Sequence, residues 1–518
     1  MTLVEMLEIH ARDIPDKIAI IYHNTKISYR ELNQTANKLA NALVEMGINE
    51  GDRVGLMLPR IPELVISFLA IAKVRGIVVP INFELLDDKI NVLLQNTMPR
   101  CLIVHEQFLK LAKRSIPSGL EIPLVLVGTE KNEEGVSWGK IIKDKKSENF
   151  RFRAEDNDIV YLNYTSGSTG NPKGAITTHS HIYWNTTASV NALKLTADDI
   201  HLCMFAPFAH PHELFARAIY LGGTMVMLDK IYPKSLAKVI SDHSVTCMMG
   251  LSPMYEKLLD VLDHYEYDLS SLRIPESGGM HTRPELVERF RQRIGVPIIP
   301  VWGSTETSGI AIAQAPEEPI VPGSVGKPCI SYEVKIVDEN DDEVGTGDIG
   351  ELIFRGPAVV NGYHEDPINN QSCFKNGWYY SGDLGKRDGE GNIYFVGRKA
   401  GMMKVAGLKV YPQEVELVLM EHPDIKEAAV IALRDNLRGE VPKAIIVTKN
   451  GRKITEKEVS AFCRNRIAQY KVPRIVEIRE SLPKIGSGKI DKKALEMEEQ
   501  RLHEILGYVS GKEDQTWL

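Results

Sequence analysis

One stretch decides how this chain is interpreted: Tyr164-Thr165-Ser166-Gly167-Ser168-Thr169-Gly170-Asn171-Pro172-Lys173-Gly174-Ala175. It follows the apolar run 159–162, and this order predicts a strand that opens into a phosphate-binding loop. Glycines let the backbone approach a ligand closely, while hydroxyl groups, free N–H groups and Lys173 are groups that bind phosphate oxygens. A P-loop NTPase is disfavoured, because no Gly-Lys-Ser/Thr closes the loop at the Walker spacing. A flexible Gly/Ser linker is the alternative, but the preceding strand and the closing Pro-Lys-Gly argue against it.

Length and composition indicate a soluble globular protein. The chain has 518 residues, of which 43% are hydrophobic and 25% charged, and its length predicts about three or four folding units. The net charge of -7 gives no indication of nucleic-acid binding. The most apolar window, 64–81, contains Lys73 and Arg75 and therefore predicts a buried helix and a strand, with no integral membrane segment.

The cysteines and the N-terminus indicate a cytoplasmic protein. The 6 cysteines are scattered without CxxC pairs, so that neither a zinc site nor a disulfide framework is expected. Residues 1–5 lack a basic start followed by an apolar core, and no secretory signal is expected.

The hydrophobic pattern predicts two doubly wound α/β halves. Helices and strands alternate before and after the loop, beginning with a helix at Ser28, whose capping box includes Glu31. Residues 320–398 contain short alternating segments and turns, which predict a small β-barrel or sandwich. From residue 399 a mixed α+β pattern returns, with expected elements at 412–421, 428–433, 443–448 and 455–468.

Four later motifs add to the loop: Trp302–Thr307, Tyr380–Asp383, Gly397–Gly407 and Pro483–Lys489. In this order they resemble the adenylate-forming superfamily, which includes acyl-CoA synthetases, peptide-synthetase adenylation domains and luciferases. Together the motifs cover most of the chain. The resemblance implies an N-terminal AMP-binding domain at 1–398, made of two α/β halves and a β-barrel at about 320–398, and a smaller mobile α+β lid domain at 399–518.

The resemblance implies a reaction in two steps. A carboxylate attacks the α-phosphate of ATP to give an acyl-adenylate and diphosphate, and a thiol then displaces AMP. Because both partners of the first step are anions, the site needs backbone donors, a metal ion and a lysine. ATP, Mg²⁺ and CoA as co-substrate are the expected ligands.

The ATP site is expected to draw on all five motifs. Trp302 stands where the family has an aromatic ring on adenine, Thr305 where a hydroxyl meets the α-phosphate, and Glu306 where a carboxylate binds Mg²⁺. The expected ATP-binding residues are Thr165, Ser166, Gly167, Ser168, Thr169, Gly170, Lys173, Gly278, Gly279, Trp302, Gly303, Ser304, Thr305, Asp383, Arg398 and Lys489, and the expected metal ligands are Thr165 and Glu306. Ser304 and Thr305 are also good helix caps, so a capped helix start is the alternative for their motif. A lone Ser-Gly-Asp, as at Asp383, is more often a turn.

Lys489 resembles the family's adenylation lysine, which bridges the carboxylate and the α-phosphate. Taken alone it would be read as a solvated surface lysine. In the family the C-terminal domain then rotates about a hinge, which here falls on Ala400 where Asp or Lys is usual. Lys404, Ala406 and Gly407 are expected to bind CoA on a glycine-centred strand, with Gly407 lining the pantetheine tunnel.

The acid is the least determined substrate. His210 matches a family histidine at the acyl-binding mouth, and the expected acyl pocket comprises His210, His212, Gly278 and Trp302. His212 and Glu213 replace small or apolar residues; they line a pocket for a polar or small acid, or they point to solvent or satisfy one another. A metal site at these residues is disfavoured, because no further ligand is evident. The motif that begins at Trp302 resembles the corresponding motif of aliphatic acyl-CoA synthetases.

The favoured function is an ATP-dependent acid–CoA ligase of an aliphatic acid, as in fatty acid metabolism, with Lys489, Thr305, Glu306 and His210 as its catalytic residues. The alternatives are a stand-alone adenylation enzyme that loads a carrier protein, a luciferase-like oxygenase and a nucleotide-binding protein without catalysis. The expected partners are small molecules and no nucleic acid, and the sequence leaves open whether the chain forms a homodimer.

Overall fold

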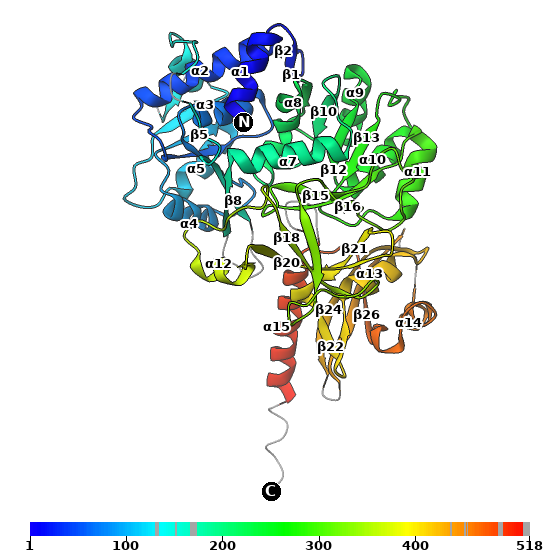
Figure 1. Cartoon of the computed structure of the whole chain (residues 1–518). Coiled ribbons are helices and arrows are strands. Elements are labelled where there is room, and N and C mark those ends of the chain that lie inside the picture. Colours follow the sequence, from blue (N-terminus) through cyan, green and yellow to red (C-terminus); the bar gives the residue numbers. More distant parts are fainter. Residues whose placement is uncertain are drawn as a thin grey trace. The chain divides into compact units, whose positions relative to one another are not determined.

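The computed structural model describes residues 1–129, 134–150, 153–165, 173–435, 438–449, 452, 454–484 and 490–510 (Figure 1). The fold is mixed α/β with a large N-terminal and a smaller C-terminal part, as predicted. By internal contacts the chain divides into two units. The larger unit comprises Met1–Lys335, Ile353–Tyr380 and Asp388–Tyr394, and the smaller comprises Ile336–Leu352, Ser381–Arg387 and Phe395–Leu518. The domain boundary expected at residue 398 stays a prediction.

The first sheet carries the phosphate-loop stretch. As far as the chain is described, its strand order is β7-β6-β5-β3-β4-β8-β9. The strands are β3 (Arg53–Met57), β4 (Ile77–Pro80), β5 (Cys101–His105), β6 (Leu124–Val127), β7 (Val136–Ser137), β8 (Ile159–Thr165) and β9 (Lys173–Thr178). All neighbours are parallel except β8 and β9, in which Thr165 pairs with Lys173. The loop therefore connects two antiparallel strands, and no helix N-terminus follows it directly.

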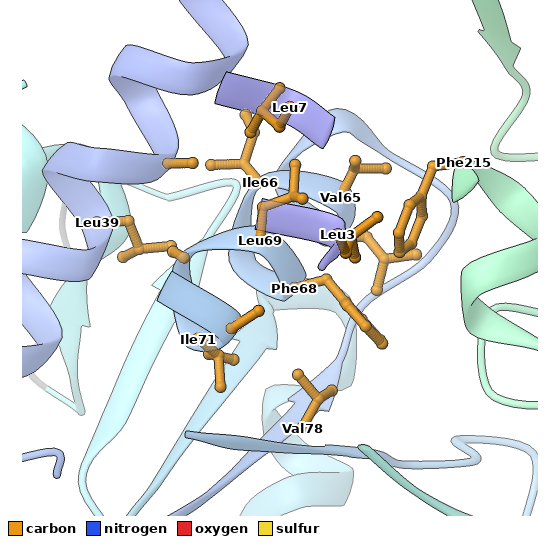
Figure 2. Close-up of a cluster of buried hydrophobic side chains, with 14 of the residues drawn as sticks. Leu3, Leu7, Leu39, Val65, Ile66, Phe68, Leu69, Ile71, Val78 and Phe215 are labelled. Carbon is orange, nitrogen blue, oxygen red and sulfur yellow. The ribbon is translucent and has the colours of Figure 1, made fainter. Parts of the chain in front are cut away.

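Helix α3 (Pro62–Lys73) forms the centre of the first half, and it confirms the predicted buried helix. It packs against α1 (Leu3–Asp13) and α2 (Tyr29–Glu45). The other helices of this half are α4 (Asp87–Thr97), α5 (Leu109–Ser115) and α6 (Trp138–Ile142). Figure 2 shows Val65, Ile66, Phe68 and Leu69 of α3 among buried residues of α1 and α2, with Phe215 beside them. The one buried cation of α3, Lys73, forms an ion pair with Glu8 at 2.5 Å, while burial lowers its pKa. The predicted capping box at the start of α2 is confirmed, since the Ser28 hydroxyl accepts from the Glu31 N–H.

The second sheet includes a hairpin from the N-terminus. Within the described residues its order is β16-β15-β14-β13-β12-β10-β11-β1-β2. The strands are β1 (Ile18–Tyr22), β2 (Thr25–Ser28), β10 (Ile200–Cys203), β11 (Thr224–Met227), β12 (Cys247–Gly250), β13 (Ile274–Ser277), β14 (Ile299–Ser304), β15 (Gly309–Ala313) and β16 (Lys327–Pro328). The helices are α7 (His179–Ala192), α8 (Ala216–Leu221), α9 (Pro233–His243), α10 (Ser252–Leu262) and α11 (Pro284–Ile294). Strand β1 pairs in parallel with β11, which places Ile20 beside Met225.

The remaining strands form two smaller sheets, which confirms the predicted short strands and the α+β C-terminal part. One sheet has the order β17-β18-β20-β19 with β21 on β20, and the other β23-β22-β25-β24 with β26 on β25. Their elements are β17 (Glu333–Val337), β18 (Gly350–Arg355), α12 (Pro367–Cys373), β19 (Phe374–Lys375), β20 (Trp378–Arg387), β21 (Ile393–Arg398), β22 (Met403–Val405), β23 (Leu408–Val410), α13 (Pro412–Met420), β24 (Ile425–Asp435), β25 (Gly439–Thr448), α14 (Glu456–Arg464), β26 (Ile475–Arg479) and α15 (Lys492–Ser510). Among the helices that the structure describes, none combines the length and the apolarity that crossing a bilayer requires.

Candidate active site

Strand β8 holds the segment that carries His210. Side chains alternate along a strand, so Tyr161 and Asn163 lie on the same face. The Asn163 amide donates to the carbonyl of Ala209 at 2.6 Å, and the Tyr161 hydroxyl lies 2.7 Å from Nδ1 of His212. The strand that leads into the phosphate loop therefore also fixes the His210 segment.

His212 and Glu213 are bonded inside the protein. His212 is 1% exposed, and burial together with the Arg217 charge lowers its pKa to about 3, so its ring is neutral at physiological pH. Glu213 is also buried and lies 3.4 Å from Arg217. Neither residue points to solvent, and their partners are Tyr161 and Arg217 and not one another. Their place in the acyl pocket stays a prediction. His210 is half-buried, with its ring 5.7 Å from that of Phe205.

Arg217 is the centre of a buried charge network that sequence reasoning missed. Its Nη1 donates to both carboxylate oxygens of Glu276 at 2.8 Å, and its Nε donates to the Ser189 hydroxyl at 3.1 Å. Burial raises the pKa of Glu276, and the Arg217 charge opposes that rise. Glu276 lies on the buried strand β13, two residues before Gly278, so the network joins the His210 segment to the predicted Gly278-Gly279 site. The sequence signal that could have revealed this network was Glu276 itself, an acidic residue in the short strand Ile274–Ser277.

Gly278 and Gly279 differ in their surroundings. Gly278 is buried, and a Cβ there would lie 2.9 Å from Cγ2 of Val301, the residue before Trp302. Gly279 is exposed with a φ of +73°, a conformation that glycine adopts without strain. The structure thus brings the Gly278 turn beside the strand that carries the Trp302 motif.

The Trp302 motif ends strand β14 and continues into a turn at 305–308 that leads to the antiparallel strand β15. The capped helix start expected as the alternative for this motif is therefore wrong. Ser304 and Thr307 still exchange cap-like bonds, because each side-chain hydroxyl accepts from the other residue's N–H, at 3.2 and 2.9 Å. The turn closes on Ser308, whose φ is +55°, and on Gly309. Gly303 packs directly on Gly309, since a Cβ would lie 2.3 Å from its carbonyl oxygen.

Trp302 is 8% exposed and stacks on Phe354, with 4.4 Å between ring centroids and 2° between ring planes. One face of the indole is therefore occupied by protein. Its predicted contact with adenine stays a prediction and requires the opposite face or the ring edge.

Glu306 is held by a tyrosine that lies outside the five sequence motifs. The Tyr363 hydroxyl donates to Oε1 of Glu306 at 2.7 Å, and both residues are buried. The Lys173 ammonium lies 5.2 Å from the centroid of the same tyrosine ring. Glu306 and Lys173, two predicted site residues from separate motifs, are therefore brought together by Tyr363. Residues 166–170, predicted to bind phosphate, lie outside the described part, and the Thr165 side chain is likewise not described.

The residues around Glu306 fit a magnesium ion that is held largely by substrate. Oε2 of Glu306 receives no hydrogen bond from any residue that the structure describes, and Thr305 beside it carries a hydroxyl. Mg²⁺ prefers oxygen ligands and usually takes one or two carboxylates together with waters and phosphates. In the described residues no group of three or more His, Cys, Asp and Glu side chains forms a protein cage for a metal.

In the smaller unit the structure brings Asp383 and Arg398 together. The Arg398 Nε lies 2.6 Å from Oδ1 of Asp383, which is 2% exposed, and the Ser381 hydroxyl accepts from the Asp383 N–H. Ala400, the predicted hinge, lies in the exposed 3-10 turn Lys399–Gly401. The Lys399 ammonium pairs with Glu351 at 2.6 Å, so a charged contact lies one residue before the uncharged hinge position.

Gly407 lies in a turn and not, as predicted, on a strand. Strands β22 and β23 form a hairpin whose turn residues Ala406 and Gly407 have φ of +49° and +82°. Asn-Gly or Gly-Gly sequences favour such two-residue turns because both positions need positive φ. A Cβ at Gly407 would meet nothing within 4 Å. Lys404 is exposed, and its N–H donates to Glu440 at 2.7 Å.

Lys489 lies outside the described residues, so its role stays a prediction. The described residues on either side of its segment, Lys484 and Ile490, form an antiparallel bridge. The Lys484 ammonium pairs with Glu427 at 2.9 Å.

Two family matches cover most of the chain. The AMP-binding enzyme family matches residues 7–364, and the AMP-binding enzyme C-terminal domain matches residues 414–489. Among curated proteins, the chain is 33% identical to the long-chain-fatty-acid–CoA ligase of Bacillus subtilis, over 97% of this chain and 96% of the relative. It is 32% identical to the medium-chain fatty-acid–CoA ligase of Escherichia coli, over 93% and 88% of the two chains.

Among solved structures, the anthranilate CoA ligase AuaEII in complex with anthranoyl-AMP is similar with a TM-score of 0.88 and 30% identity, over 96% of this chain and 97% of that one. The o-succinylbenzoate CoA synthetase of Bacillus subtilis in complex with ATP and magnesium has a TM-score of 0.83 and 26% identity, over 94% and 98%.

Proposed function

The chain belongs to the AMP-binding enzyme family and is an AMP-forming acid–thiol ligase that uses ATP, Mg²⁺ and CoA, and from this premise we propose that its acid is aliphatic. The two curated relatives described above are named for long-chain and medium-chain fatty acids. The similar AuaEII structure is named for an aromatic acid, so family membership alone does not choose between these classes.

One structural observation carries the proposal: a cluster of aromatic rings includes Phe208, two residues before His210. Phe83 stacks on Phe108 with 4.1 Å between ring centroids, and Phe208 meets the edge of Phe83 at 5.1 Å. All three rings are half-buried and follow the carboxyl ends of parallel strands, where α/β sheets bind ligands. Nδ1 of His212 and the Glu213 carboxylate, two of the polar groups that suggested a polar acid, already have partners within the protein. An apolar acyl chain fits such a wall better than a charged one.

The proposed mechanism assigns charge control to the residues around Glu306. The acid's carboxylate oxygen attacks the α-phosphorus, the bond to the β-phosphate bridging oxygen breaks, and diphosphate leaves. Lys173, the loop N–H groups and Lys489 offset the negative charge. Glu306 would hold Mg²⁺, which would neutralise phosphate charge. The CoA thiol then loses its proton and attacks the acyl carbonyl, and AMP leaves as the carbonyl–oxygen bond breaks. Asp383 and Arg398, already paired with each other, are the proposed ribose contacts.

An acid panel tests the proposed substrate. With ATP, Mg²⁺ and CoA, we expect kcat/KM for hexanoate, octanoate and dodecanoate to exceed that for malonate and carnitine by at least about tenfold, because each buried methylene contributes about 0.8 kcal/mol. Anthranilate and benzoate provide the aromatic comparison, and a carrier protein in place of CoA tests the other acceptor. AMP and diphosphate should form in equal amounts with acyl-CoA. A preference for a polar or aromatic acid would contradict the proposal, and release of ADP would contradict the mechanism.

The turn at Gly407 supports a second, separable prediction about CoA. Gly407→Leu should lower thioester formation by on the order of 10²-fold, since small displacements of a reacting group can cost that much, while adenylate formation is kept. Gly407→Ala is the matched control, because it has the same backbone strain at positive φ without the bulk. The two half-reactions are measured separately, by diphosphate exchange and from preformed acyl-adenylate. Equal loss of both half-reactions in Gly407→Leu argues against a CoA role for this turn.

We further propose a cytoplasmic location. All of the cysteines are unpaired in the structure, which suits a reducing compartment. Fractionation of the native host, with the ligase activity as readout, tests this location.

A further inference from the structure

Tyr363 connects the carboxylate of Glu306 to the strand that follows the phosphate loop. Its hydroxyl donates to Oε1 of Glu306 at 2.7 Å. Its backbone forms a bridge with Ala175 on β9, and the neighbouring residues add two bonds to the same strand, from the Ile176 N–H to the Gly362 carbonyl and from the His364 N–H to the Gly174 carbonyl. One short segment therefore touches both the proposed magnesium ligand and the end of the phosphate loop.

The same segment also holds the backbone of Glu306. The Val360 N–H donates to the Glu306 carbonyl at 2.8 Å, so the residue is held at its backbone and at its side chain. These contacts leave the carboxylate little freedom to rotate. Because Tyr363 takes Oε1, the carboxylate presents Oε2 in a set direction.

Asn370 fixes Tyr363 itself. The Asn370 side chain accepts from the Tyr363 N–H at 2.6 Å and donates to the Tyr363 carbonyl at 2.9 Å. Gly362 leaves room for this amide, since a Cβ there would lie 2.8 Å from its oxygen. Phe374 packs against the ring, with 5.5 Å between centroids. The tyrosine is thus held on its backbone and on its ring, as expected of a group that orients another.

The chemistry of the pair suits an orienting bond. A tyrosine phenol has an ordinary pKa of about 10, so its hydroxyl carries a proton near neutral pH and can donate to the Glu306 carboxylate. A hydrogen bond to an ionised carboxylate favours its charged form, which is the form that binds a cation.

We propose that Tyr363 is a positioning residue that orients the Glu306 carboxylate toward magnesium-bound ATP. The inference rests on the proposed role of Glu306 and extends it. Tyr363 does not touch the reacting atoms; it acts through Glu306 and couples that carboxylate to β9. Outer partners of metal ligands act in this way, since they set the orientation and basicity of the ligand.

Tyr363→Phe tests the proposal, because it removes only the hydroxyl and keeps the ring beneath Lys173 and against Phe374. We expect the magnesium concentration needed for half-maximal diphosphate exchange to rise by about tenfold. Calorimetry supplies a readout independent of turnover: ATP affinity without Mg²⁺ should match the wild type, while the gain in affinity on adding Mg²⁺ should shrink. The KM for CoA should not change.

Two further variants separate the possible causes. Tyr332→Phe also removes a buried tyrosine hydroxyl bonded to this motif, to the Thr307 carbonyl at 2.6 Å, and should leave the magnesium curve unchanged. Glu306→Gln should shift that curve at least as far as Tyr363→Phe. An unchanged curve in Tyr363→Phe alongside a shifted one in Glu306→Gln overturns the role of Tyr363 alone. Equal shifts in Tyr332→Phe and Tyr363→Phe indicate general loosening and also overturn it. An unchanged curve in Glu306→Gln overturns the proposed role of Glu306.

Discussion

Lys489→Ala should slow acyl-adenylate formation by on the order of 10²- to 10³-fold, the loss typical of removing one preorganised donor from a developing charge. Lys489 is assigned to the first step only, in which the acid's carboxylate and the α-phosphate of ATP, two anions, must come together. ATP binding, and thioester formation from a preformed adenylate, should therefore persist. Diphosphate exchange measures the first step, calorimetry measures ATP binding, and acyl-adenylate with CoA measures the second step.

Lys484 offers a matched control for Lys489, because it belongs to the same motif and its ammonium pairs with Glu427 at 2.9 Å. Lys484→Ala should leave adenylate formation within about twofold of the wild type, as expected for an exposed ion pair of small energy. Lys489→Arg keeps the charge but not the compact ammonium, and should recover only part of the rate. Unchanged adenylation in Lys489→Ala would remove this lysine from the mechanism.

Arg217→Met should destabilise the folded protein severely. Breaking a buried ion pair by removing one partner costs about 3 to 5 kcal/mol, because the other charge is left buried and uncompensated. Arg217 faces two such charges, Glu276 at 2.8 Å and Glu213 at 3.4 Å. Since a chain with two units need not unfold in a single transition, the measurement is the shift of the first thermal or urea midpoint.

The pH dependence of the stability lost in Arg217→Met identifies the cause of that loss. Burial already raises the pKa of Glu276 in the folded state, and removal of Arg217 should raise it further. An acid whose folded pKa lies above its unfolded value destabilises the fold as pH rises past the unfolded value, near 4.3 for Glu. The difference in the first unfolding midpoint between Arg217→Met and the wild type should therefore be larger at pH 8 than at pH 5.

Two further variants serve as controls for Arg217→Met. Adding Glu276→Gln to Arg217→Met should restore part of the midpoint, because it removes one of the stranded charges. Lys238→Met breaks an exposed i,i+4 pair with Asp242 and should change the midpoint very little. The midpoint difference could instead be independent of pH and persist in the double variant. Lost packing, and not an unpaired buried charge, would then explain the lower stability of Arg217→Met.

Local sequence patterns determined several helices and the candidate motifs. The Ser28–Glu31 capping box and the apolar helix α3 were both predicted, because each depends on residues within a few positions of one another. The candidate phosphate and magnesium residues came from motif order along the chain, which is also a property of the sequence alone.

Tertiary structure alone decided which distant groups meet. Strand β1 joins the second sheet beside β11, a pairing across about two hundred residues that no local periodicity encodes. Tyr363 reaches Glu306 across 57 positions, and Arg217 reaches Glu276 across 59. The turn after β14 excludes the capped helix start that was the alternative for this motif. The same Ser and Thr hydroxyls can cap either conformation, and only the pairing of β14 with β15 chooses between them. The sequence by itself thus determined which chemical groups are available and which short elements carry them. The partners of those groups depend on long-range packing, because contacts between distant residues form only when the sheets assemble.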